Sequence, residues 1–139
     1  MNIAQIIDAI NGIDPNKSNW ENELFDLCQQ ARTLGVTELT AAVLFQLLER
    51  YPDTYFGNPG PIVHALESFA DFQTGLVASV KRQPVPSTMG MLNRVLNLKM
   101  PEALRKQWLD LLEESTHHPT ASKTAKDNAK GFLEYQLCH

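Results

Sequence analysis

A histidine, a serine and an aspartate recur along one segment as His64, Ser68 and Asp71, whose apolar neighbours repeat at helical intervals. A hydroxyl together with an imidazole and a carboxylate is the set that acyl-transfer enzymes use for nucleophilic catalysis. The members of such a set normally converge on a pocket from separate elements, whereas these three share the polar stripe of one predicted helix. The pattern therefore favours a solvated helix face over a catalytic site.

Metal chemistry is suggested by His117 and His118, which are followed by Pro119. Adjacent histidines cannot both face one ion on a helix, and no cysteine or acidic residue stands near them at ligand spacing. The sequence also has no glycine-rich phosphate loop before a helix, no His-Glu-x-x-His motif and no cysteine cluster. We therefore expect a protein that is not an enzyme and that uses no metal or cofactor.

Charge is distributed unevenly along the chain. Residues 1–71 hold ten acidic and three basic side chains, a net charge of -7, whereas residues 72–139 hold six acidic and nine basic ones, a net charge of +3. Nucleic-acid binding needs clustered basic groups to replace the counterions on phosphates, so the acidic half does not fit that role and suits a basic protein partner instead.

The densest turn chemistry lies between Tyr51 and Glu67. Pro52 is expected to end the preceding helix, because proline lacks an amide donor and moves the residue before it out of the helical region. Gly57 and Gly60 can take positive φ angles, and Pro61 fits the first turn of a new helix. We therefore predict a rigid loop, and we call residues 51–60 the focal loop.

Twelve residues of this segment, Phe56 to Glu67, read FGNPGPIVHALE. They resemble the FG-x-PGP-(L/V/I)-VH-x-(L/I/V)-E segment of small, all-helical bacterial immunity proteins, which accompany the toxins of contact-dependent growth inhibition and other polymorphic toxin systems. An acidic residue precedes the Phe-Gly pair in that segment, whereas this sequence has Tyr55 there and Asp53 two positions earlier. The resemblance implies an inhibitor that binds and neutralises a cognate toxin domain.

These observations give a candidate partner-binding surface. Its carboxylates would meet a basic substrate site, such as that of a nuclease toxin, and its aromatic side chains would serve as anchors. The candidate residues are Glu23, Asp26, Asp53, Tyr55, Phe56, His64, Glu67 and Asp71. The alternative is a helical adaptor or scaffold that binds some other protein, and the two hypotheses differ in affinity and in whether a toxin gene lies immediately upstream.

Composition predicts one domain over residues 1–139, monomeric or weakly dimeric. The apolar content of 43% and charged content of 20% are those of an ordinary soluble protein. The longest apolar run, Ala41 to Phe45, is far short of the roughly 20 residues that cross a bilayer. The N-terminus lacks the features of a secretory signal, so we expect a cytoplasmic protein with Cys28 in its core and Cys138 exposed.

Apolar residues recur at helical spacing throughout, and no alternating strand pattern or hairpin turn interrupts them. The sequence predicts an all-α fold of seven or eight short helices, arranged as stacked antiparallel hairpins that are either HEAT-like or part of a globular bundle. Predicted helix signals include a capping box from Ser18 to Glu21, N-caps at Thr37 and Ser87, and a break at Thr74 and Gly75.

Overall fold

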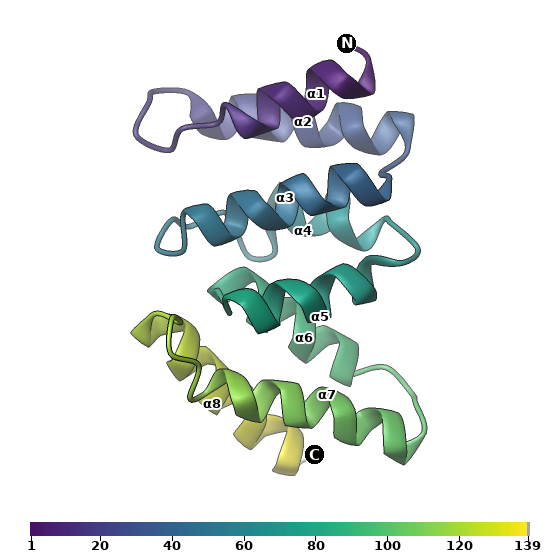
Figure 1. The fold of residues 1–139 in the computed structure, drawn as a ribbon, viewed down its shortest axis with the longest axis vertical. Helices are drawn as coiled ribbons and strands as arrows, with labels where there is room; N and C mark the ends of the chain where they lie inside the picture. The colour runs from purple at the N-terminus through teal and green to yellow at the C-terminus, as the bar shows by residue number, and fades with distance from the viewer. Residues whose placement is uncertain (139) are drawn as a thin grey trace. The chain divides into compact units, whose positions relative to one another are not determined.

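The computed structural model describes residues 1–138, which form eight α-helices and no β-strand (Figure 1). The predicted all-α class is therefore confirmed. The helices are α1 (Ile3–Asn11), α2 (Trp20–Leu34), α3 (Glu38–Arg50), α4 (Gly60–Glu67), α5 (Phe72–Arg82), α6 (Pro86–Leu96), α7 (Glu102–Ser115) and α8 (Lys123–Cys138). Within these residues, none of the helices is long and apolar enough to cross a membrane.

The chain divides into two compact units, Met1–Gly75 and Leu76–His139. The HEAT-like and bundle alternatives both concern the arrangement of the whole chain, and they stay predictions, as does the single domain. Helix α5 begins in the first unit, and its residues from Leu76 onward belong to the second.

The first unit is built from α1 to α4 around one apolar core. Helix α1 packs against α2 and α3, and α4 packs against α2 and α3, as the first two hairpins of Figure 1 show. Each helix contributes one apolar stripe, and fully burying a leucine or isoleucine side chain stabilises a fold by roughly 1.5–3 kcal/mol. The core includes Ile6, Ile10, Leu24, Leu27, Cys28, Ala31, Leu44, Leu47, Leu48, Ile62 and Leu66.

Gly75 lies inside α5, so the predicted helix break at Thr74 and Gly75 is wrong. A β-carbon at Gly75 would lie 2.8 Å from Cε2 of Phe45, which is fully buried in α3. Glycine is needed at this position because the α5 backbone passes close to an aromatic ring. The sequence pattern gave a break because a helical glycine and a turn glycine look alike without the neighbour.

Helix starts follow the predicted chemistry in one case and depart from it in another. Thr37 caps α3 as predicted, and its hydroxyl accepts a hydrogen bond from the Thr40 amide at 3.3 Å. Ser87 does not cap α6, which begins at Pro86. The buried Thr88 hydroxyl instead accepts from the Val85 amide at 3.1 Å and donates to the Val85 carbonyl at 3.1 Å.

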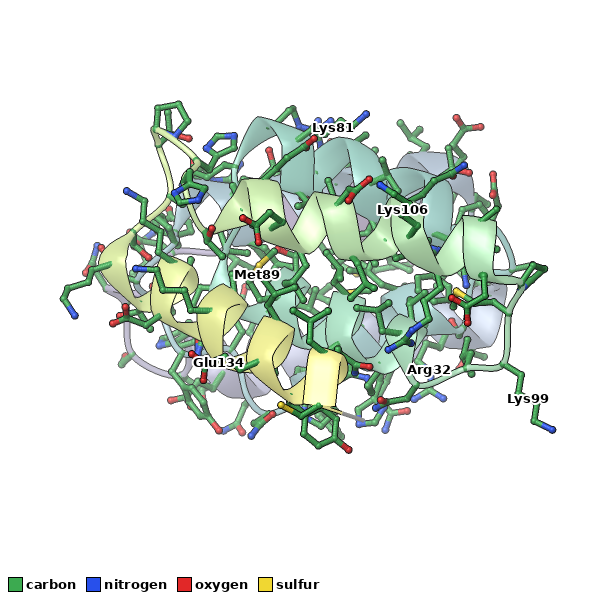
Figure 2. The ribbon with its side chains drawn as sticks, turned by 90° about the horizontal axis from the view of Figure 1, so that it is seen from below. Arg32, Lys81, Met89, Lys99, Lys106 and Glu134 are labelled. Carbon is green, nitrogen blue, oxygen red and sulfur yellow. The ribbon has the colours of Figure 1, made fainter. Side chains whose placement is uncertain are left out.

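The second unit packs α6, α7 and α8 against one another. Figure 2 shows Met89 enclosed among the helices and Lys99 extending outward from the connector after α6, and Met89 is fully buried. Ala125 and Ala129 are also fully buried, and their small side chains let α8 approach its neighbours closely. Periodicity predicted buried side chains for Leu104 and Leu137, but they are 41% and 67% exposed.

Arg105 of α7 joins the C-terminal ends of two other helices in this unit. Its Nη1 donates to the Leu96 carbonyl at 2.8 Å, and its Nη2 donates to the Gln136 carbonyl at 3.1 Å and to Gln136 Oε1 at 3.2 Å. Gln136 Nε2 in turn donates to Oδ1 of Asn93 at 2.8 Å and of Asn97 at 2.9 Å. A fixed positive charge therefore lies where α6 and α8 present carbonyl groups that their own helices leave unbonded.

Candidate functional site

Helix α2 begins one residue later than the sequence predicted, at Trp20, and Asn19 is its N-cap. Asn19 has the left-handed backbone angles φ 64° and ψ 11°, which asparagine tolerates better than most residues, and its Oδ1 accepts from Asn22 Nδ2 at 2.8 Å. The predicted capping box from Ser18 to Glu21 is therefore wrong. Glu21 lies in the first helical turn, where the helix dipole favours a negative charge.

The focal loop folds tightly on itself between α3 and α4. Gly57 and Gly60 have φ angles of 106° and 85°, as the turn chemistry predicted, and the Asn58–Pro59 peptide bond is cis. A β-carbon at Gly57 would lie 2.6 Å from the Gly60 Cα, closer than real side chains come. Pro61 lies in the first turn of α4, also as predicted.

The two neighbouring aromatic residues of the loop have opposite environments. Phe56 is 7% exposed, and its ring meets the Trp20 ring edge to face, with the centroids 5.7 Å apart and the planes at 85°. Tyr55 is 75% exposed. Phe56 therefore fixes the loop to the start of α2, which leaves Tyr55 as the ring that a partner can reach.

A hollow of about 270 Å³ opens where the start of α2 meets the focal loop. Four aromatic side chains and one carboxylate contribute to it, and Phe25 is half exposed. The lining residues are Trp20, Glu21, Asn22, Leu24, Phe25, Tyr55, Phe56, Gly57 and Pro61, and we call this feature the aromatic hollow.

The structure brings only two of the predicted site residues, Tyr55 and Phe56, into the aromatic hollow. Glu23 and Asp26 are exposed on α2 without lining it, and Asp53 is exposed on the focal loop. The remaining predicted residues lie along and after α4: His64 is exposed, Glu67 is half-buried and Asp71 is exposed.

The three polar residues His64, Ser68 and Asp71 form no catalytic arrangement. The Ser68 hydroxyl donates to the Ala65 carbonyl at 2.6 Å, and an Asp71 carboxylate oxygen accepts from the Thr74 hydroxyl at 2.7 Å. Both polar groups thus serve local backbone and side-chain structure, while His64 is exposed. The prediction that all three residues share one helix face is wrong, because α4 ends at Glu67 and only His64 lies within it.

Sequence reasoning missed Glu21 and Phe25 as members of the site. They are four residues apart, so they share one side of α2, next to the apolar stripe that carries Leu24. The one sequence signal for this site was Phe25, an aromatic residue outside the apolar stripe of the helix. The pattern could not supply the neighbouring element, because the hollow forms where the start of α2 meets the focal loop.

Of the two adjacent histidines in the second unit, His117 is exposed, with its Nε2 3.8 Å from Glu113 Oε1 four residues earlier, so the expectation that no acidic residue stands at ligand spacing is wrong. His118 has a structural role. His118 Nδ1 accepts from the Thr120 amide at 3.2 Å, which leaves Nε2 to carry the proton and donate to the Lys81 carbonyl at 2.8 Å. In the part of the chain that the structure describes, no group of three or more His, Cys, Asp or Glu residues could hold a metal ion.

Comparisons with protein-family models, curated proteins and solved structures find no match to this chain.

Proposed function

We propose that the protein binds a cognate toxin domain and neutralises it by covering its active site, in the manner of an immunity protein. The observation that carries the proposal is the location of the FGNPGPIVHALE segment. Three of its residues, Phe56, Gly57 and Pro61, line the aromatic hollow, and Tyr55 immediately before it is 75% exposed. The segment that resembles immunity proteins therefore forms part of a recessed aromatic surface, which is the usual composition of an interface centre.

The net charge of -7 over residues 1–71 supports a basic partner. Glu23 and Asp26 carry exposed carboxylates on α2, on other sides of the helix from Glu21 and Phe25 of the hollow, and Asp53 is exposed on the focal loop. Enzymes that act on nucleic acids need basic sites to hold phosphates, so a carboxylate surface can occupy the same site and speed association electrostatically. A nuclease toxin is accordingly the first candidate, and the protein would act by occlusion without chemistry of its own.

The test pairs the protein with the product of the gene immediately upstream of its own. Expression of that product alone should arrest growth, and co-expression of the protein should restore it. The interface is tested with the triple variant Glu23→Lys, Asp26→Lys, Asp53→Lys, whose three positions are exposed in the folded chain. We expect slower association, a weaker dependence of the association rate on salt, and loss of protection.

The matched control reverses three basic residues of α8, Lys123→Glu, Lys126→Glu and Lys130→Glu, and should keep protection. Circular dichroism checks that both triple variants remain helical. Full protection by the acidic-surface variant, or loss of protection only in the α8 variant, would move the interface to the second unit. An upstream product that is harmless, together with tight binding to an unrelated protein, would favour the adaptor or scaffold hypothesis.

A further inference from the structure

We propose that the aromatic hollow takes the guanidinium group of an arginine side chain presented by the partner. The inference deepens the proposed function and rests on it for the partner's identity, but not for the chemistry of the hollow. A planar cation is attracted to the faces of aromatic rings, and guanidinium both stacks on rings and pairs with a carboxylate in a fixed geometry.

The hollow supplies both kinds of contact. Phe25 and Tyr55 are exposed rings in its lining, and Glu21 is an exposed carboxylate in the same lining. Of the described residues that line it, none is a lysine or arginine. A guanidinium that enters therefore meets aromatic rings and a carboxylate, and no basic side chain in the lining opposes it.

The N-terminal end of α2 opposes a cation, because its unbonded amides amount to roughly half a positive charge. Glu21 in the first turn carries a full negative charge, and Glu23 follows it in the same turn. The local balance at the start of α2 is therefore negative, so a cation is favoured over an anion.

The size of the hollow points to a single side chain. Its volume of about 270 Å³ lies below the roughly 300–1,000 Å³ of pockets that bury drug-sized ligands. A side chain that projects from a partner surface needs only a shallow, open recess of this kind, whereas a free cofactor or metabolite needs more enclosure.

A second hollow of about 320 Å³ in the other unit provides a contrast. It also contains a tryptophan, Trp108, and two acidic residues, Asp110 and Glu114, but Lys81 belongs to its lining. A cation is thus already present there, whereas the lining of the aromatic hollow has none, so the two tryptophans report on hollows with and without a basic side chain. Trp108 serves as an internal control for Trp20.

The experiment titrates the wild-type protein with N-acetyl-arginine methylamide and follows the two tryptophan indole N–H signals by ¹H–¹⁵N NMR. The variants Trp20→Phe and Trp108→Phe assign the signals. We expect a saturable shift of the Trp20 signal at millimolar probe, with the Trp108 signal unmoved. N-acetyl-citrulline methylamide has the same shape without the charge and should cause no saturable shift.

Glu21→Gln should weaken binding of the arginine probe about tenfold, as for loss of a hydrogen bond to a charged group.

The matched control for Glu21→Gln is Glu102→Gln, which neutralises an exposed glutamate in the first turn of α7 in the other unit and should leave the titration unchanged. Equal binding of the citrulline probe, or an unchanged affinity in Glu21→Gln, overturns the inference. Absence of probe binding together with intact toxin protection by Glu21→Gln overturns it while the proposed function stands. Saturable arginine binding by a protein that protects against no toxin supports the inference and overturns the proposed function.

Discussion

The Trp20 ring meets the Phe56 ring edge to face, with their centroids 5.7 Å apart. Trp20 is the first residue of α2, and Phe56 is the first residue of the FGNPGPIVHALE segment, so 35 residues of chain separate them along the sequence. Both rings line the aromatic hollow, and their contact holds the focal loop, which carries Tyr55, against the start of α2. Of these two neighbours, Phe56 therefore stabilises the fold, and Tyr55 is the ring that a partner can contact.

Alanine substitutions test whether Phe56 stabilises the fold and Tyr55 does not. Phe56→Ala should destabilise the fold by about 3 kcal/mol, because it removes a buried ring and its partner contact with Trp20. Tyr55→Ala should change the free energy of unfolding by less than about 0.5 kcal/mol, because the side chain is 75% exposed. Urea unfolding measures both values. Equal destabilisation by the two substitutions would contradict the assignment of Phe56 alone to the fold.

The conformation of the focal loop gives a second prediction. Gly57→Ala should destabilise by about 1–3 kcal/mol, because Gly57 has a φ angle of 106° and an added β-carbon would meet the Gly60 backbone. The control is Gly131→Ala in α8, where an added β-carbon meets nothing within 4 Å and alanine should stabilise by about 0.4–1 kcal/mol. Thermal melts of the two variants should therefore shift in opposite directions, and a Gly57→Ala protein that melts with the wild type refutes the rigid loop.

Local chemistry made some features of the fold readable from the sequence. The positive φ angles of Gly57 and Gly60, the position of Pro61 and the Thr37 cap all depend on residues within a few positions of one another. Gly75 could not be interpreted in the same way, because its role depends on Phe45, thirty residues earlier.

The candidate site was predicted only in part, because some of its features depend on residues distant in the sequence. The charge distribution and the aromatic pair made the acidic residues, Tyr55 and Phe56 candidates, whereas the exposure of Tyr55 and the hollow itself depend on which helix packs beside the loop. Periodicity assigns Trp20 and Leu24 to an apolar face but does not say that this face meets α4. Periodicity also cannot say where a core ends, so it assigned Leu137 to an apolar face although that residue is 67% exposed.

Arg105 gives a prediction for the second unit. Arg105→Met should destabilise by about 2–3 kcal/mol, because the carbonyls of Leu96 and Gln136 lose a charged donor at 2.8 and 3.1 Å. The adjacent residue supplies the control: Lys106 forms an exposed pair with Asp110 at 2.9 Å, so Lys106→Met should change stability by less than about 0.5 kcal/mol. Both values come from urea unfolding, and similar effects of the two substitutions would show that the Arg105 hydrogen bonds add little.

The two free cysteines differ in burial, as the sequence predicted, and this difference gives a last prediction. Burial raises the pKa of the Cys28 thiol from 9.0 to about 12, although the charge of Arg32 acts in the opposite direction. At pH 8, iodoacetamide should therefore modify Cys138 in the folded protein and reach Cys28 only after unfolding.

The raised pKa of Cys28 also predicts how stability depends on pH. Below pH 9 the thiol is neutral in both the folded and the unfolded chain, so the protein keeps the full benefit of burying it. Between pH 9 and 12 the unfolded chain loses the thiol proton and the folded chain retains it, so ionisation favours unfolding. By pH 10.5 this effect should lower the free energy of unfolding of the wild type by about 2 kcal/mol. The Cys28→Ala variant lacks the thiol and should not show this loss. Urea unfolding of both proteins at pH 8 and 10.5 gives the stability change of each. Subtracting the change in Cys28→Ala from that in the wild type removes the contribution of the other groups that titrate in this range. Parallel losses in the two proteins would mean that the Cys28 thiolate is tolerated in the folded state.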